Sequence, residues 1–276
     1  MLTRIITGVV GIAVAACVIQ TGGMTFAIGG VILALIAWFE YCRAFAQKGY
    51  NPALIIGGIA ITALCYTAWT GHMAVLMPFW TVATVLVILA MTVLQHGDFN
   101  VGSAMVSLGG IFYLGVPFAH MIALRLLGAG QPVLNTSMGS FEHGCAFIWL
   151  ALIGTWASDT FAYFAGSFLG KHKMCPAISP KKTIEGFAGG LIGTTLSVAA
   201  LGNFFSFDLM TMAVLGLCIC MVATLGDLVE SVMKRYTGIK DSGNIIPGHG
   251  GVWDRFDSVL YTIPFVFYFI HFVSIF

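Results

Sequence analysis

Acidic and basic side chains gather in the last third of this sequence, at spacings that suit phosphate chemistry. Four polar residues recur at i, i+3, i+4 and i+7, which places them on one face of a helix. They are Asp227, Glu230, Ser231 and Lys234. Asp254, Asp257 and Ser258 repeat the i, i+3, i+4 spacing further along, and we expect them on the next helix. Two acidic faces on consecutive helices can converge on a hard cation through oxygen ligands.

A glycine-rich loop separates these two acidic stretches. Its polar parts are residues 240–243 and 247–251, where bare backbone can approach a phosphate closely. An alternative interpretation is a structural loop held by ion pairs, such as Lys234 with Asp257. That alternative accounts for some of the charges, but not for acids, bases, serines and glycines concentrated within residues 226–258. We therefore favour a site of chemistry.

A second polar segment, residues 179–186, reads SPKKTIEG and opens a new apolar stretch. Pro180 favours the start of a helix. Lys181, Lys182 and the Thr183 hydroxyl would then lie beside free backbone N–H groups, and a helix N-terminus of this kind binds phosphates well. The alternative is that the two lysines are ordinary anchors that flank a membrane span. Ser179 and Glu185 complete the segment.

A third feature is a carboxylate inside an apolar stretch. Asp159, Tyr163 and Gly166 follow at i, i+4 and i+7, which is one helical face. An ionisable residue within a spanning helix costs about 2.5–3.5 kcal/mol on insertion scales, so its presence invites a functional explanation. We expect this face to receive a polar ligand. The alternative is an aspartate whose oxygens are satisfied by hydroxyl groups of a neighbouring helix.

Together these features predict metal-assisted phosphoryl or nucleotidyl transfer. Carboxylates suit a metal ion, lysines suit phosphates, and a glycine loop allows close approach of backbone. The residues alone name neither the nucleotide nor the acceptor, because the sequence has no P-loop and no GxGxxG pattern between a strand and a helix.

The elements that must position these residues are membrane helices. Hydrophobic residues make up 59% of the 276 residues and charged residues 8%, with a mean hydropathy of +0.96, whereas soluble domains carry about 25% charged residues. We predict an all-α, polytopic membrane protein. The net charge of +1 indicates neither a nucleic acid nor a strongly acidic partner. The seven cysteines form no CxxC pair, so no zinc site or disulfide framework is expected.

Nine apolar stretches are long enough for spanning helices, which need about 20 residues. We expect them near residues 4–21, 24–42, 51–70, 73–95, 101–127, 145–169, 184–203, 209–233 and 258–276. The first follows Arg4 and has the charged start and apolar core of a signal peptide, but no clear small-residue cleavage site ends it. We expect it to be retained as the first span.

The distribution of basic residues predicts the orientation. In the nine-span arrangement, eleven of the twelve lysines and arginines fall on one side, and Arg125 is the exception. By the positive-inside rule that side is cytoplasmic, so the N-terminus is predicted to lie inside. Charges are sparse before residue 150. We therefore divide the chain into residues 1–150, a scaffold that could also dimerise or guide lipid, and residues 151–276, a catalytic region.

The string SVMKRYTGIKDSGNIIPGHGGVWDRFD, residues 231–257, resembles the signature of the phosphatidate cytidylyltransferases, the CDP-diacylglycerol synthases. The likeness extends upstream to residues 226–231, to residues 179–186, and to Ser158, Asp159, Ala162 and Tyr163. It covers roughly residues 155–260, and the earlier part matches only as apolar spans. A signature of this length and polarity is specific.

The resemblance implies transfer of a cytidylyl group from CTP to phosphatidic acid, and a homodimer whose site faces the cytoplasm from the bacterial inner membrane. It implies a magnesium ion held by Asp227 and Asp254, extended to Asp257 and Glu230, with a second cation such as potassium. Lys234 and Lys240 join the two aspartates as catalytic residues. The substrate-binding residues that it implies are Asp159, Tyr163, Ser179, Lys181, Lys182, Thr183, Glu185, Arg235, His249 and Arg255.

Two other activities stay open at this point. A CTP-dependent lipid kinase of the dolichol or phytol kinase type would also be multi-spanning. A transporter could instead use Asp159, Asp227 and Asp254 to coordinate a driving ion. Transporters often show matched internal repeats, whereas the charges here are concentrated in one half of the chain. The DGxxAR pattern of the CDP-alcohol phosphotransferases is absent from the sequence.

Overall fold

The computed structural model of the protein describes residues 2–245 and 250–273, with side chains from residue 7 onward. The chain forms two compact units. Unit 1 comprises Met1–Ala123 and Lys234–Phe256, and unit 2 comprises Leu124–Met233 and Asp257–Phe276. Each unit is therefore made of two stretches of chain that are distant in sequence.

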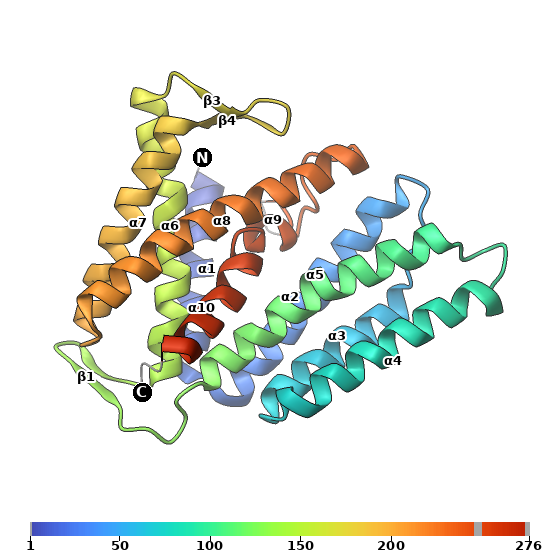
Figure 1. Cartoon of the computed structure of the whole chain (residues 1–276), viewed down its shortest axis with the longest axis horizontal. Coiled ribbons are helices and arrows are strands. Elements are labelled where there is room, and N and C mark those ends of the chain that lie inside the picture. Colours follow the sequence, from blue (N-terminus) through green and yellow to red (C-terminus); the bar gives the residue numbers. More distant parts are fainter. Residues whose placement is uncertain (1, 246–249, 274–276) are drawn as a thin grey trace. The chain divides into compact units, whose positions relative to one another are not determined.

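The structure is helical, with two short hairpins (Figure 1). The helices are α1 (Leu2–Thr21), α2 (Gly23–Ala46), α3 (Leu54–Trp69), α4 (Met73–Leu94), α5 (Val101–Leu126), α6 (His143–Leu169), α7 (Ile184–Phe204), α8 (Leu209–Thr237), α9 (Trp253–Phe256) and α10 (Val259–Val273). Strands β1 (Leu134–Thr136) and β2 (Gly139–Phe141) pair antiparallel, as do β3 (Lys173–Cys175) and β4 (Ser179–Thr183).

Within the described part of the chain, seven stretches of helix are long and apolar enough to cross a membrane: Gly23–Ala46, Met73–Leu94, Val101–Leu126, His143–Leu169, Ile184–Phe204, Leu209–Thr237 and Trp253–Val273. Helix α3, Leu54–Trp69, is apolar but shorter. The 16 residues of α3 extend about 24 Å, against a hydrocarbon thickness of about 30 Å. The prediction of an all-α, polytopic membrane protein is confirmed, and each expected apolar segment contains a helix.

In unit 1, glycines let aromatic side chains of α2 pack against neighbouring helices. A β-carbon at Gly57 or at Gly110 would overlap the ring of Trp38, and at Gly110 also that of Tyr41. The Trp38 Nε1–H donates to Leu54 O at 2.9 Å, and the Tyr41 hydroxyl donates to Val106 O at 3.1 Å. Small residues at helix contacts are the usual means by which membrane helices approach closely. The packing holds α2 against α3 and α5.

In unit 2, α6 and α7 run side by side along their length (Figure 1). Glycines of α7 recur on the face that meets α6. A β-carbon at Gly189 would overlap Ala165, and one at Gly193 would overlap the ring of Phe161. The close approach leaves the β3–β4 hairpin at the end of this helix pair, directly before α7.

Two local expectations differ from the structure. Pro180 does not begin a helix: it lies in β4, and α7 begins at Ile184, because Thr183 caps the helix and the preceding residues pair with β3. Asp254, Asp257 and Ser258 also do not share one helix, because α9 ends at Phe256 and α10 begins at Val259. Between these two helices, the backbone N–H of Ser258 donates to the Asp257 side chain, at Oδ1, over 2.6 Å.

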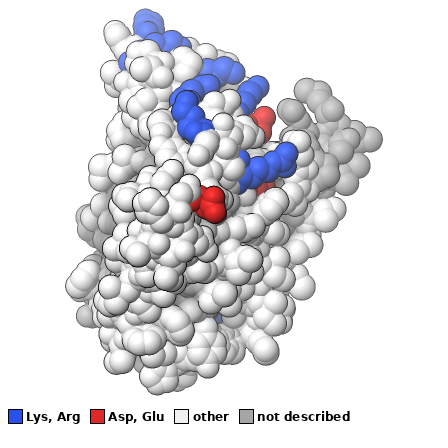
Figure 2. All heavy atoms as spheres, turned by 90° about the vertical axis from the view of Figure 1, so that its right-hand side faces the viewer, with Lys and Arg blue, Asp and Glu red and all other residues white. Residues whose placement is uncertain are grey.

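The outer surface is suited to lipid. Large apolar side chains are widely exposed, for example Ile55, Val93 and Phe168. Figure 2 shows one face on which most of the visible atoms belong to residues that are neither basic nor acidic. Monomeric soluble proteins rarely expose contiguous apolar surface of this extent.

Candidate active site

The predicted polar face of α8 forms as expected. Asp227, Glu230 and Ser231 all lie within this helix, and the Ser231 hydroxyl donates to Asp227 Oδ1 at 3.3 Å, a contact that the i, i+4 spacing allows. Glu230 is buried, with 1% of its surface exposed. Lys234 follows on the same face, in the last turn of the helix.

In unit 2, the Lys182 ammonium lies 2.7 Å from Asp227 Oδ2. The two side chains are 24% and 29% exposed, so the ion pair is only partly shielded from its surroundings. Lys182 lies in β4, two residues before α7 begins. The structure therefore brings a cation of the predicted phosphate segment to a predicted metal ligand.

Thr183 fixes the point at which this segment becomes helix. Its Oγ1 accepts the backbone N–H of Gly186 at 3.1 Å, which caps α7. A β-carbon at Gly166, Gly170 or Gly186 would lie 2.8–3.0 Å from that oxygen. The sequence placed Gly166 on the face of Asp159, and the structure shows that this glycine makes room for the cap.

Glu185 holds the hairpin that carries the lysines. Its carboxylate accepts the backbone N–H of Lys171 at 3.0 Å and that of His172 at 3.2 Å, and lies 2.5 Å from His172 Nδ1. The Ile184 N–H donates to His172 O at 2.9 Å. The hairpin is thus fastened at its base to the first turn of α7. Glu185 acts on Lys171 and His172, and through them on the segment that bears Lys181 and Lys182.

The predicted residues of α6 are accessible. Asp159 and Tyr163 are both exposed, with 70% of the Tyr163 surface free. Lys181 is also exposed, and Ser179 is half-buried on β4. These four residues belong to unit 2, as do Lys182, Thr183 and Asp227. Unit 2 therefore contains most of the predicted nucleotide-binding residues.

In unit 1, Asp254 is the centre of a second polar cluster. Its Oδ1 lies 3.0 Å from Lys234 Nζ, and its Oδ2 accepts the backbone N–H groups of Ser242 and Gly251, each at 2.8 Å. Only 4% of the Asp254 side chain is exposed. Gly250 has a φ of +83°, and a β-carbon there would lie 2.5 Å from Asp254 Oδ2. The glycines of the loop thus allow its backbone to close on the carboxylate.

Sequence reasoning did not assign a role to Glu40, yet it belongs to this cluster. Glu40 is 2% exposed on α2. Its carboxylate accepts the Ser242 hydroxyl at 3.0 Å and the backbone N–H groups of Val252 at 3.0 Å and Trp253 at 2.8 Å. One feature of the sequence pointed to Glu40: it is an acidic residue inside an apolar stretch. Such residues are rare in spanning helices and usually have a function.

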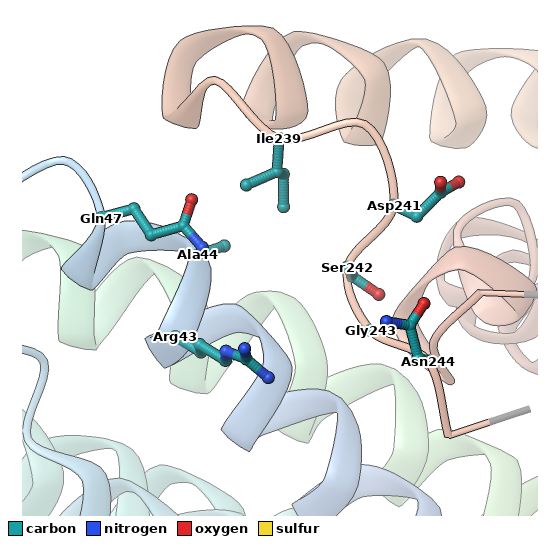
Figure 3. A pocket seen from close by; sticks show the side chains of 8 residues that line it. All are labelled: Arg43, Ala44, Gln47, Ile239, Asp241, Ser242, Gly243 and Asn244. Atoms are coloured by element: carbon teal, nitrogen blue, oxygen red, sulfur yellow. The ribbon is translucent and has the colours of Figure 1, made fainter.

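A polar pocket of about 110 Å³ adjoins the same loop. Figure 3 shows Arg43 extending from α2 and Gln47 from the position directly after its end, with the segment 239–244 running opposite them. Ser242 lines the pocket and also donates to Glu40 and to Asp254. Ser242 therefore connects the lining of the pocket to the buried carboxylates of unit 1.

The remaining predicted residues are Lys240, Arg235, Arg255, Asp257 and His249. Lys240, Arg235 and Arg255 are exposed in unit 1, and Asp257 is half-buried in unit 2. His249 lies outside the described residues.

Lysine–aspartate pairs occur among the described residues of both units, and their carboxylates suit magnesium. Among the described residues, no three His, Cys, Asp or Glu side chains gather closely enough to hold a metal ion by themselves. Magnesium is usually bound by one or two carboxylates together with substrate phosphates and water. Asp227 and Asp254 supply oxygen ligands of that kind, and the adjacent lysines suit the phosphates. The donor chemistry thus fits magnesium bound together with a nucleotide.

Comparison with known proteins extends over nearly the whole chain. The profile of the cytidylyltransferase family matches residues 2–273. The chain is 33% identical over 267 residues to a phosphatidate cytidylyltransferase of Staphylococcus aureus (strain COL), and the match covers 96% of each chain. It is 32% identical over 270 residues to the phosphatidate cytidylyltransferase of Staphylococcus saprophyticus, again over 96% of each. The chain therefore belongs to the cytidylyltransferase family.

Proposed function

We infer that the protein transfers a cytidylyl group from CTP to phosphatidic acid, giving CDP-diacylglycerol and pyrophosphate. The observation that carries this function is the match to phosphatidate cytidylyltransferases over 96% of both chains. The polar clusters support it, because each combines a carboxylate with a lysine in a protein built of apolar helices.

The reaction requires two polyanions to meet. An oxygen of the phosphatidate phosphate forms a bond to the α-phosphorus of CTP, and the bond between the α-phosphorus and its bridging oxygen to the β-phosphorus breaks, so that pyrophosphate leaves. The attacking phosphate is already largely ionised near neutral pH, so no strong general base is needed. The main barrier is repulsion between the reactants, and fixed cations lower it.

The protein's own residues divide this work. Lys181, Lys182 and the capped helix start at Thr183 are proposed to hold the nucleotide phosphates. Asp227 and Asp254 are proposed as magnesium ligands, an assignment that rests on the signature and on their oxygen chemistry. Magnesium supplies charge neutralisation at the phosphates. With substrate bound, Asp227 and Asp254 would hold the metal, and the lysines now paired with them would hold phosphates.

Further residues complete the proposed site. Lys234 and Lys240 are proposed to act on the reacting phosphates, Glu230 and Asp257 to extend the metal site, and a second cation such as potassium to accompany magnesium. Contacts to the two substrates are assigned to Asp159, Tyr163, Ser179, Glu185, Arg235, His249 and Arg255.

The topology of the protein is also a proposal. Nine spans with the N-terminus in the cytoplasm place all but one of the basic residues on the cytoplasmic side. The catalytic region would then receive CTP from the cytosol and phosphatidic acid from a bacterial inner membrane. We assign residues 151–276 to catalysis, and residues 1–150 to scaffolding, homodimer formation or lipid access.

Labelled CTP tests the activity against its alternatives. Purified protein in detergent is incubated with phosphatidic acid and magnesium, and CTP carries the label at either the α- or the γ-phosphate. Label from the α-phosphate should enter the lipid, and a chelator should stop its incorporation until magnesium is restored. Lipid label from the γ-phosphate would show a lipid kinase. An ion flux in liposomes without CTP consumption would show a transporter.

A further inference from the structure

Glu40 and Asp254 hold the same two stretches of backbone in unit 1. Asp254 Oδ2 accepts the N–H groups of Ser242 and Gly251, each at 2.8 Å. Glu40 accepts the Ser242 hydroxyl at 3.0 Å and the N–H groups of the two residues after Gly251, at 3.0 and 2.8 Å. The two carboxylates thus fasten both ends of the loop between Ser242 and Gly251.

The glycines beside these contacts show how closely Glu40 approaches the loop. A β-carbon at Gly243 would lie 2.6 Å from Glu40 Oε1. A β-carbon at Gly251 would overlap both Glu40 oxygens and the Ser242 hydroxyl. Only glycine at these positions lets the chain pass the carboxylate without displacing it. The glycine content of the loop is therefore explained by carboxylate contact as well as by access for phosphate.

A carboxylate at this position is unusual unless it has a task. Glu40 is 2% exposed and lies within α2, one of the helices able to span the membrane. A buried charge is tolerated only when it is hydrogen-bonded, and three donors meet this one. The nearest of these is the N–H of Trp253, the residue immediately before Asp254.

We propose that Glu40 is a positioning residue, which sets the orientation of the Asp254 carboxylate by fixing Ser242 and residues 251–253. This inference rests on the proposed function, in which Asp254 is a magnesium ligand. Groups that orient a metal ligand change metal affinity or activity by about 10- to 100-fold when they are removed. Glu40 does not contact Asp254 itself in these hydrogen bonds. It acts on Asp254 through Ser242 and through the backbone N–H groups of residues 252 and 253.

The test compares Glu40→Gln with Asp98→Asn. The first keeps the size of the side chain but removes its charge and one of its acceptor oxygens. The second neutralises an exposed acid of the same unit. In Glu40→Gln we expect the magnesium concentration for half-maximal activity to rise about tenfold and kcat to fall. The KM for CTP at saturating magnesium should change much less, and Asp98→Asn should resemble the wild type.

Two readouts do not depend on turnover. Hydrogen exchange of the backbone amides at residues 251–253 should become about tenfold faster in Glu40→Gln, because hydrogen bonds to a charged acceptor are lost. The thermal stabilisation that magnesium with CTP gives the wild type should also require more magnesium in the variant. Ser242→Ala removes one donor to Glu40 and should change the exchange rate and the magnesium requirement in the same direction, by a smaller amount. This variant replaces Glu40→Gln in the test if Glu40→Gln does not accumulate.

The possible outcomes distinguish the positioning role of Glu40 from the proposed cytidylyl transfer. A variant with a lower melting temperature but an unchanged magnesium requirement would overturn the positioning role and leave a structural one. Unchanged exchange at residues 251–253 would overturn the tether itself. Failure of the wild type to make CDP-diacylglycerol would instead count against the proposed function, and the exchange measurement would still decide whether Glu40 holds the loop.

Discussion

Lys182 Nζ lies 2.7 Å from Asp227 Oδ2, an ion pair between the strand that precedes α7 and the middle of α8. The sequence predicts a phosphate ligand at one of these residues and a metal ligand at the other. Their contact in unit 2 brings the two predicted groups together. Such an arrangement suits a metal–nucleotide complex, in which the cation and the phosphates bind together.

Neutralising either member of this pair should remove most of the activity. We expect Lys182→Met and Asp227→Asn each to lower kcat by about 100-fold or more, since each removes a charge that acts on the reacting phosphates. The double variant should lose little beyond the worse single variant, because residues that act as a unit are not additive. Lys173→Met, at an exposed lysine of β3, is the matched control. Simple additivity of the two losses would show that the residues act separately.

Lys234 should matter for stability as well as for activity. The Lys234→Met change leaves the 4%-exposed Asp254 side chain without its cation. Breaking a buried pair in this way costs about 3 kcal/mol, at the lower end of the usual range because the N–H groups of Ser242 and Gly251 still bind the carboxylate. Unfolding in mixed detergent micelles measures the loss. If Lys240→Met, at an exposed lysine, lowers the free energy of unfolding by the same amount, the Lys234–Asp254 pair does not stabilise the protein more than a surface charge does.

The glycine contact between α6 and α7 should not tolerate a methyl group. In Gly186→Ala the new β-carbon would lie 2.8 Å from Ala162 O and 2.9 Å from Thr183 Oγ1. Overpacking of this kind destabilises by about 1–3 kcal/mol. Gly58→Ala on α3 places its β-carbon 3.5 Å from Leu35 Cδ2, an ordinary contact, and should have little effect. Melting temperatures in detergent compare the two, and equal values would contradict the crowding.

Glu185 should influence CTP binding through the hairpin. Glu185→Ala removes the acceptor for the N–H groups of Lys171 and His172. We expect the KM for CTP to rise by about tenfold or more, because misplaced binding groups lose substrate orientation. Glu185→Gln retains an acceptor oxygen and should be less affected. Hydrogen exchange at residues 171–173 monitors the hairpin; faster exchange without a change in KM would remove this segment from nucleotide binding.

The helices, the family and the shared helix faces could all be predicted from the order of the residues. Apolar stretches of about 20 residues are sufficient to predict membrane helices, because lipid leaves the backbone few other ways to satisfy its hydrogen bonds. The i, i+4 spacing of Asp227 and Ser231 likewise predicted that they share one helical face, and the Ser231 hydroxyl donates to Asp227 there. The polar signature at residues 231–257 predicted the family that the comparisons confirmed.

Which distant groups meet could be seen only once the chain was folded. The β3–β4 hairpin replaced an expected helix start at Pro180, because pairing with another segment outweighed the local preference of proline. Glu40 bonds to Trp253 across 213 residues of sequence, and no periodicity connects these positions. A buried carboxylate must find hydrogen-bond donors, but which donors it finds depends on the path of the whole chain.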